Sequence, residues 1–83
     1  MKILYFSWLR QKTGIDSEDV VVPENVSNVA GLIEWLKERN ETFAVALSDF
    51  DSIRVAVNQE LAELDAPVAQ GDEVAIFPPM TGG

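Results

Sequence analysis

The sequence contains no cysteine and no histidine. Without cysteine the chain has no disulfide framework, no zinc–thiolate site and no thiolate nucleophile. Without histidine it lacks the side chain that proteins use most often as a general base and as a metal ligand. Any sulfur that takes part in the chemistry of this protein therefore has to come from outside the chain.

Basic residues are also scarce. Six lysines and arginines stand against 14 aspartates and glutamates, which gives a formal net charge of −8. Such a surface repels nucleic acid and anionic lipid headgroups, so we expect neither a nucleic acid nor a membrane as a partner, and we favour basic proteins. Several acidic residues form short groups that we interpret as solvated surface: Asp16, Glu18 and Asp19; Glu60, Glu63 and Asp65; Asp72 and Glu73.

Long apolar runs are missing as well, and none approaches the length of a transmembrane helix. The opening run is interrupted by Ser7 and lacks a small-residue cleavage site, so we interpret it as a first strand rather than a signal peptide. The expected compartment is the cytoplasm. Asp49 and Asp51 are two carboxylates without further spaced ligands, so we predict no metal site.

The remaining residues predict one α+β domain with a modest core. Apolar runs, some of them alternating, predict strands, and a 3.6-residue apolar period predicts helices. The elements expected in chain order are a strand at 2–8, a helical turn at 9–14 that ends at Gly14, a strand at 17–22, a helix after the N-cap Ser27 that ends near Arg39 and Asn40, a short helix at 41–47, and strands at 52–58, 60–64 and 72–77.

The main helix carries one apolar stripe, formed by Val29, Leu32, Ile33 and Leu36. Strands on both sides of this helix indicate a mixed sheet with the helix packed on one face. A ubiquitin-like β-grasp domain over residues 1–77 fits this order, since its first and last strands lie parallel in the middle of the sheet. The other sheet face is then partly open, and large apolar side chains on it would form a docking surface.

Residues 78–83 form an extended tail after the last predicted strand. Pro78 has no N–H for a strand ladder, so regular pairing should stop there. The two prolines keep the tail extended, with a reach of at most about 20 Å. Gly82 and Gly83 have no side chains, so a narrow channel in a partner could admit them. An ATP-using partner could convert the Gly83 carboxylate to an acyl-adenylate, and a sulfur donor could then leave a thiocarboxylate.

Three segments of the chain carry a family resemblance. They are GDEVAIFPPMTGG at positions 71–83, VNQE at positions 57–60, and LYFSWLRQKTG at positions 4–14, with Arg10 and Gly14 in place. Together they resemble the ubiquitin-like sulfur carriers, and in particular the small subunits of molybdopterin synthase. The resemblance covers nearly the whole chain.

The resemblance implies a specific use of the tail. Gly83 would be adenylated by an E1-like activating enzyme that uses ATP, and a sulfur donor protein would turn it into a thiocarboxylate. The carrier would dock on the large synthase subunit, two carriers to a heterotetramer, and pass its sulfur to a cyclic pyranopterin phosphate. The catalytic side chains would belong to the large subunit, so this chain would be a sulfur-donating subunit that is not catalytic alone and holds no cofactor.

The same resemblance assigns individual residues. Thr81 and Gly82 would enter the partner's active site together with Gly83. Arg10 would pair with an acidic group of a partner or would simply be solvated, and both alternatives stay open. Phe6 and Trp8 are further candidates for partner contact, although for Phe6 we favour core packing. The residues most directly implied in the partner contact are Phe77, Pro78, Pro79 and Met80.

Three alternatives to this role remain. The chain could be a related carrier that feeds thiazole synthesis or tRNA thiolation, with the same tail chemistry and another acceptor. It could be a ubiquitin-like protein modifier, in which Gly83 ends in an isopeptide bond to a lysine. It could also be a β-grasp interaction module whose tail is inert.

Overall fold

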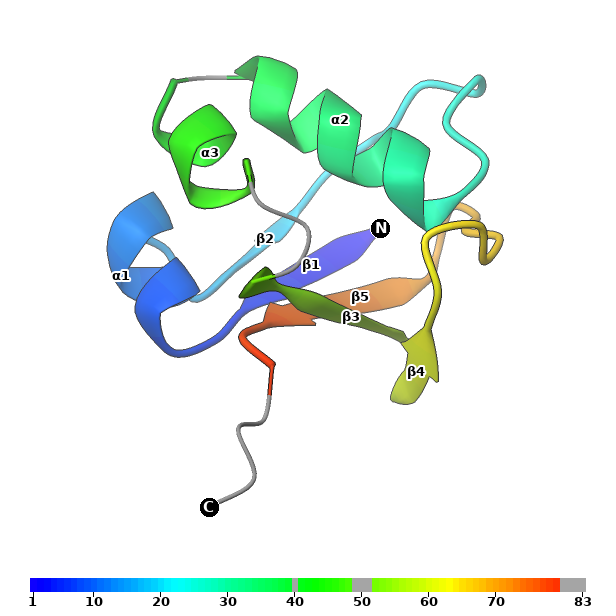
Figure 1. Ribbon diagram of the computed structural model, residues 1–83. Helices are drawn as coiled ribbons and strands as arrows, with labels where there is room; N and C mark the ends of the chain where they lie inside the picture. Colours follow the sequence, from blue (N-terminus) through cyan, green and yellow to red (C-terminus); the bar gives the residue numbers. More distant parts are fainter. Residues whose placement is uncertain (40, 49–51, 80–83) are drawn as a thin grey trace.

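The computed structural model describes residues 1–39, 41–48 and 52–79. The predicted positions Asn40, Asp49 and Asp51 and the tail residues 80–83 lie outside the described residues. Strands and helices follow one another along the chain in the predicted order (Figure 1): β1 (Lys2–Tyr5), α1 (Trp8–Thr13), β2 (Ser17–Asp19), α2 (Val29–Arg39), α3 (Glu41–Ala46), β3 (Arg54–Val57), β4 (Glu60–Ala62) and β5 (Glu73–Phe77).

The last strand lies at the centre of a five-stranded sheet with the order β2-β1-β5-β3-β4. β1 and β5 pair in parallel, with Lys2 opposite Glu73 and Tyr5 opposite Ile76, and the other neighbours pair in an antiparallel manner. The helices α1, α2 and α3 lie on one side of this sheet (Figure 1). A mixed sheet with a parallel central pair and helices on one face is the predicted β-grasp architecture, so the predicted fold class is confirmed.

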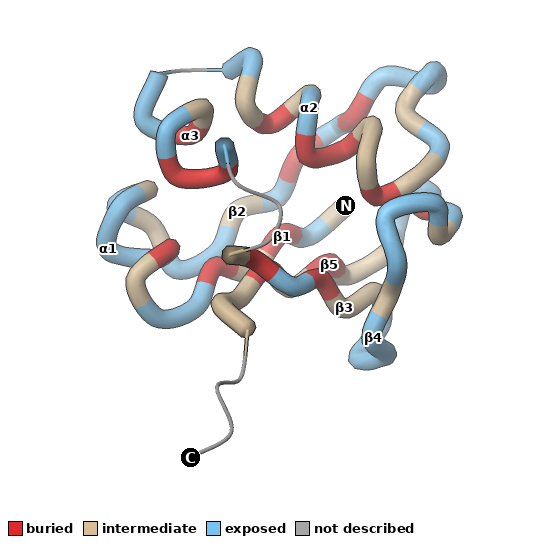
Figure 2. Tube along the Cα trace, in the orientation of Figure 1, coloured by how far each residue is buried: buried red, intermediate tan, exposed pale blue. Residues whose placement is uncertain are grey.

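Many of the buried residues lie on α2, α3 and the central strands β1 and β5 (Figure 2), and they form the core. The predicted stripe of α2 is completely buried. Burial alternates at the start of β3, because Ile53 and Val55 are buried and Arg54 is exposed. Each sheet strand of the central pair buries every second residue; the buried residues on β1 and β5 are Ile3, Tyr5, Val74 and Ile76.

Three strands end two or three residues earlier than the sequence predicts. β1 ends at Tyr5, because Ser7 has φ 58° and ψ −134°, outside the range of a strand. β2 ends at Asp19, which pairs with Lys2 at the first position of β1, and the Val20 N–H then donates to the Met1 carbonyl at 2.8 Å. β4 ends at Ala62, because the chain then turns so that the Leu64 carbonyl accepts a bond of 2.8 Å from the Ala30 N–H in the first turn of α2.

The N-cap of α2 is Asn28 and not Ser27, so that prediction was wrong. Asn28 Oδ1 accepts a hydrogen bond of 2.8 Å from the Gly31 N–H in the first turn. The Ser27 carbonyl instead accepts a bond of 3.0 Å from the Val68 N–H, next to the bridge that pairs Asn28 with Pro67 in the loop before β5. Both residue types are good caps, so the choice depends on this tertiary contact and not on propensity.

Glu18 links the edge strand β2 to the helices, which corrects its interpretation as solvated surface. Glu18 Oε1 accepts a bond of 2.7 Å from Arg39, and Oε2 accepts one of 2.8 Å from the Tyr5 hydroxyl. The Arg39 guanidinium also lies over the rings of Trp35 and Phe43, 5.2 and 5.5 Å from their centroids. Burial raises the pKa of Glu18, but the bonds from Arg39 and Tyr5 outweigh it and leave that pKa below its ordinary value.

Tyr5 provides a test of this link through its ionisation. Its burial, and then its hydrogen bond to Glu18, raise the pKa of Tyr5 above its ordinary value. The unfolded chain ionises first, so this contribution to stability is present below about pH 10 and is lost as the pH rises further. Tyr5 is the only tyrosine, so tyrosinate absorbance reports it alone. We expect that absorbance to appear together with unfolding, and its appearance in folded protein near pH 10 would contradict the buried link.

Candidate functional site

A row of apolar side chains crosses the sheet face that the helices leave open. The register places Leu4 beside Ala75, Ala75 beside Ala56 and Ala56 beside Leu61, across four adjacent strands. The strand neighbours of Leu4 and Ala75 are buried in the core, so alternation directs these two residues to the open face. Ala56 and Leu61 lie on the same face through their pairing with Ala75 and with each other. Leu61 is 78% exposed and the other three are half-buried. Such a row is an apolar surface available to a partner.

Phe6 and Phe77 extend this surface at the end of the central strand pair. The Phe6 N–H donates to the Ile76 carbonyl at 3.1 Å, which puts Phe6 level with Phe77. Phe77 in turn lies opposite Arg54 on β3. Phe6 is 47% exposed, so the favoured interpretation of Phe6 as a core residue was wrong. The reason is alternation, because the buried face of β1 is already occupied by its odd-numbered residues. We refer to Leu4, Phe6, Ala56, Leu61, Ala75 and Phe77 as the open face.

The root of the tail lies beside these two phenylalanines. β5 ends at Phe77, which agrees with the prediction that regular pairing stops at Pro78. The next bond of the parallel ladder would run from residue 78 to the Phe6 carbonyl, and a proline has no N–H to donate. The Phe6 carbonyl accepts instead from the Leu9 N–H at 3.1 Å. The chain therefore leaves the sheet at Pro78 without a partner on the β1 side.

Arg10 and Trp8 both lie on α1, which follows the end of β1. The Arg10 Nε is 3.6 Å from the Asp16 carboxylate, and the two side chains are 54% and 81% exposed. An ion pair this exposed contributes little to stability, so Arg10 can exchange it for an acidic group of a partner. Trp8 is half-buried and packs against the core, which favours a structural role for this residue.

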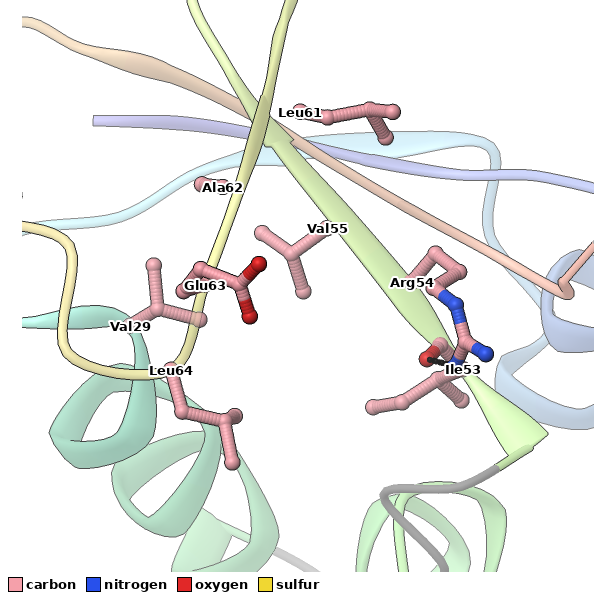
Figure 3. Close-up of a pocket in the computed structure, with 8 residues that line it drawn as sticks. All are labelled: Val29, Ile53, Arg54, Val55, Leu61, Ala62, Glu63 and Leu64. Carbon is pink, nitrogen blue, oxygen red and sulfur yellow. Dashed lines mark hydrogen bonds between the residues drawn. The ribbon is translucent and has the colours of Figure 1, made fainter.

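A groove of about 460 Å³ lies between the start of α2 and the β3–β4 pair (Figure 3). Its inner wall is formed by the buried side chains of Val29, Ile53 and Val55. Its charged lining residues are Arg54 and Glu63. Arg54 Nη1 donates to the Ile53 carbonyl at 2.8 Å (Figure 3). This arrangement brings together no nucleophile with a base, so we place the functional site at the open face and not in this groove.

The part of the chain that the structure describes contains no group of three or more acidic, histidine or cysteine side chains that could hold a metal ion. Within those same residues, no helix is long and apolar enough to cross a membrane. What the described residues do bring together is an apolar docking surface and the start of an unpaired extended segment. Such a combination suits the presentation of a chain end to another protein.

The sequence analysis singled out Phe77 and Pro78 but missed most of the open face. The signal for Ala75 was present, because β5 alternates between residues that face opposite sides of the sheet. The position of Leu61 could not be found in this way, because it depends on the pairing of β4 with β3. Sequence reasoning gives the face of each residue on its own strand, but not which residues of separate strands meet.

Comparison with known proteins agrees with this architecture. The model of a family described as the ThiS family matches residues 3–83. The chain is 37% identical to the molybdopterin synthase sulfur carrier subunit of Escherichia coli, over 100% of this chain and 99% of that protein. It resembles the structure of a putative molybdopterin converting factor subunit 1 from Pyrococcus furiosus, with 34% identity, a TM-score of 0.77 and coverage of 95% of both chains. It also resembles small archaeal modifier protein 1 of Haloferax volcanii, with 27% identity, a TM-score of 0.78 and coverage of 96% and 97%. The chain belongs to the ThiS family.

Proposed function

We propose that this protein is the sulfur-carrier subunit of a molybdopterin synthase and acts in molybdenum cofactor biosynthesis. Its full-length similarity to the Escherichia coli sulfur carrier subunit supports this role. The human molybdopterin synthase sulfur carrier subunit is also similar, with 34% identity over 87 residues, and the match covers 93% of that protein. The family membership therefore agrees with the resemblance that the sequence motifs indicate.

One structural observation carries the proposal. The central strand β5 runs directly out of the sheet into the tail, at the edge of an exposed apolar face. The tail begins directly after Phe77, a residue of the open face, at the C-terminal end of β5. A partner that covers the open face therefore also receives the tail. The free energy of binding at the open face can then hold the chain end in the partner's active site. The reaction at the chain end becomes effectively unimolecular, because no second encounter between the two proteins is needed.

The chemistry that we propose takes place at Gly83. An E1-like enzyme uses ATP to convert the Gly83 carboxylate to an acyl-adenylate, and a sulfur donor protein replaces the adenylate to leave a thiocarboxylate. The thiocarboxylate sulfur then attacks a cyclic pyranopterin phosphate in the active site of the large synthase subunit. Water cleaves the thioester that results, which leaves the sulfur on the product and restores the Gly83 carboxylate. The absence of cysteine and histidine from the sequence supports this division of labour, in which the partner supplies the catalytic side chains. Because activation depends on ATP, we place the carrier in the cytoplasm.

The proposed assembly is a heterotetramer of two carriers and two large subunits. The large subunit covers the open face, contacts Pro78, Pro79 and Met80, and admits Thr81 and Gly82 in its channel. Arg10 lies on α1 after the end of β1, where its side chain can reach an acidic group of the same partner. The strong negative charge of the carrier favours a partner with a basic docking surface.

Alkylation followed by mass spectrometry tests the proposed chemistry. The carrier, incubated with its activating enzyme, ATP and a sulfur source, should gain about 16 Da from the exchange of oxygen for sulfur, and methionine oxidation gives the same nominal change. A thiol-selective alkylating reagent separates the two, because without cysteine only a terminal thiocarboxylate can react. We expect one alkylated group per chain, mapped to Gly83. If no alkylated species forms, the carrier function is wrong.

Protein modification is the second candidate, because of the likeness to small archaeal modifier protein 1. A modifier joins its terminal carboxyl group to a lysine and produces conjugates of higher mass. An antibody against the protein should then detect such conjugates in cell extracts, and their loss after deletion of Gly83 would support modification. Detection of the free carrier alone would favour sulfur transfer.

A further inference from the structure

Ser7 adopts a backbone conformation that is unfavourable for any residue other than glycine. Its φ of 58° and ψ of −134° lie in a region that L-residues rarely occupy. The other non-glycine residues with positive φ among those described are Asn58 and Gln59, in the turn between β3 and β4. Asn58 is held there by side-chain bonds to Asp72 and to the Glu73 N–H, whereas the Ser7 side chain makes no capping bond to α1.

The strained residue forms a tight turn between β1 and α1. The Leu9 N–H donates to the Phe6 carbonyl at 3.1 Å, so Phe6 to Leu9 form a β-turn with Ser7 in its second position. The angles of Ser7 are those of a type II′ turn, for which glycine is the usual residue there. Strain of this kind persists only where the surrounding structure enforces it, and it collects at functional positions.

The turn has two consequences at the root of the tail. It stops the hydrogen bonding of the β1 side to β5 after the Phe6 N–H, so that the exposed Phe6 ring stays level with Phe77 on the open face. It also occupies the Phe6 carbonyl, the acceptor to which the β5 ladder would have extended at position 78. Ser7 beyond the end of β1 and Pro78 beyond the end of β5 thus stop the pairing of the two central strands at the same level.

We propose that Ser7 is a positioning residue for docking, which acts by holding Phe6 in place beside the root of the tail. This inference rests on the proposed function and assigns a role within the same site. The backbone angles of Ser7 position Phe6, and the hydroxyl group of Ser7 is not required for this. Glycine, which adopts the same angles without strain, should therefore preserve docking, and a β-branched residue, which resists them, should impair it.

Two substitutions at this position separate strain from function. We expect Ser7→Gly to raise Tm by about 4 °C, through relief of strain, and to bind the purified large synthase subunit within about twofold of the unaltered protein. We expect Ser7→Val to lower that affinity about tenfold, the size of effect seen at important interface residues. Binding is measured by calorimetric titration well below the Tm of each variant, and Ser7→Thr replaces Ser7→Val if the latter does not fold.

A double-mutant cycle with Phe6→Ala tests whether Ser7 acts through Phe6. If it does, Ser7→Val will cause no further loss of affinity in the Phe6→Ala protein, whereas independent effects would add. Additive losses, or a folded Ser7→Val protein that binds normally, would overturn the inference alone. A failure of the unaltered protein to bind the large subunit would instead overturn the proposed function and with it this role for Ser7.

Hydrogen exchange at the Leu9 amide gives a readout that needs no partner. This amide bonds to the Phe6 carbonyl only while the turn is formed. We expect similar protection in the unaltered protein and in Ser7→Gly, and at least about tenfold faster exchange in Ser7→Val, because local opening sets the rate. Equal protection in all three proteins would show that Ser7 does not control the turn and would overturn the inference.

Discussion

A carrier lengthened by one glycine after Gly83 will bind the large synthase subunit normally and transfer sulfur at least about 100-fold more slowly. One additional residue moves the carboxylate by about 3.3–3.6 Å along the tail. Misplacement of a reacting group by as little as 1 Å can cost about 100-fold in rate, so we expect product formation to fall at least that far. The open face is unchanged in this variant, so its affinity for the large subunit should stay the same.

The matched control for this experiment is Thr81→Ser, which keeps the length and the glycine pair of the tail. Product formation is followed in a reconstituted reaction with the activating enzyme, ATP, a sulfur source and the large subunit. Thr81→Ser should retain most of the activity. If the lengthened carrier still transfers sulfur at a rate close to that of the control, the terminal carboxylate is not the reacting group.

The second large effect is expected from Leu61→Arg on the open face. Leu61 is 78% exposed, so a charged side chain there should change the stability of the free carrier by no more than about 0.5 kcal/mol. In the complex the same charge would be buried against a partner without compensation. We expect the affinity for the large subunit to fall at least about tenfold, measured by titration of one purified protein into the other.

Val45→Arg is the control for this substitution. Val45 is also an exposed apolar residue, 68% accessible, but it lies on α3 on the helical side of the molecule. The same change of charge at Val45 should leave binding unaffected, which separates the loss of a contact from a general effect of charge. Equal losses of affinity in both variants would show that the open face is not the docking surface.

The type of each element could be predicted because local patterns determine it. Val29, Leu32, Ile33 and Leu36 are spaced so that they share one face in a helix, and this spacing predicted α2. Gly14 ends α1 with a left-handed φ of 81°, as is common for glycine at this position. Strand ends were less predictable, because β2 and β4 stop where a neighbouring segment ends or the chain turns toward α2. The exchange of Ser27 for Asn28 as N-cap has the same origin, since a contact with Val68 decides it.

The site was only partly accessible to sequence reasoning. The tail and its prolines were recognised because proline and glycine act through their own backbone properties. Phe6 was misplaced because both faces of the opening strand are apolar, so the sequence did not show that β1 buries its odd-numbered residues. The turn at Ser7 was missed because β1 was predicted to continue to residue 8. No glycine or proline marks that turn, and a serine in a type II′ position cannot be distinguished by local pattern from a serine in a strand.

The parallel pairing of β1 with β5 has a consequence for the synthesis of the protein. The central position of the sheet stays empty until residues 73–77 have left the ribosome, so β1 and β3 have no common neighbour before then. Nascent chains that stop short of this strand cannot complete the fold and cannot occupy a partner. Under the proposed function, chains cut between Phe77 and Gly83 would fold and dock without a reactive end, so proteolysis at the tail would turn a donor into a competitive inhibitor of its own complex.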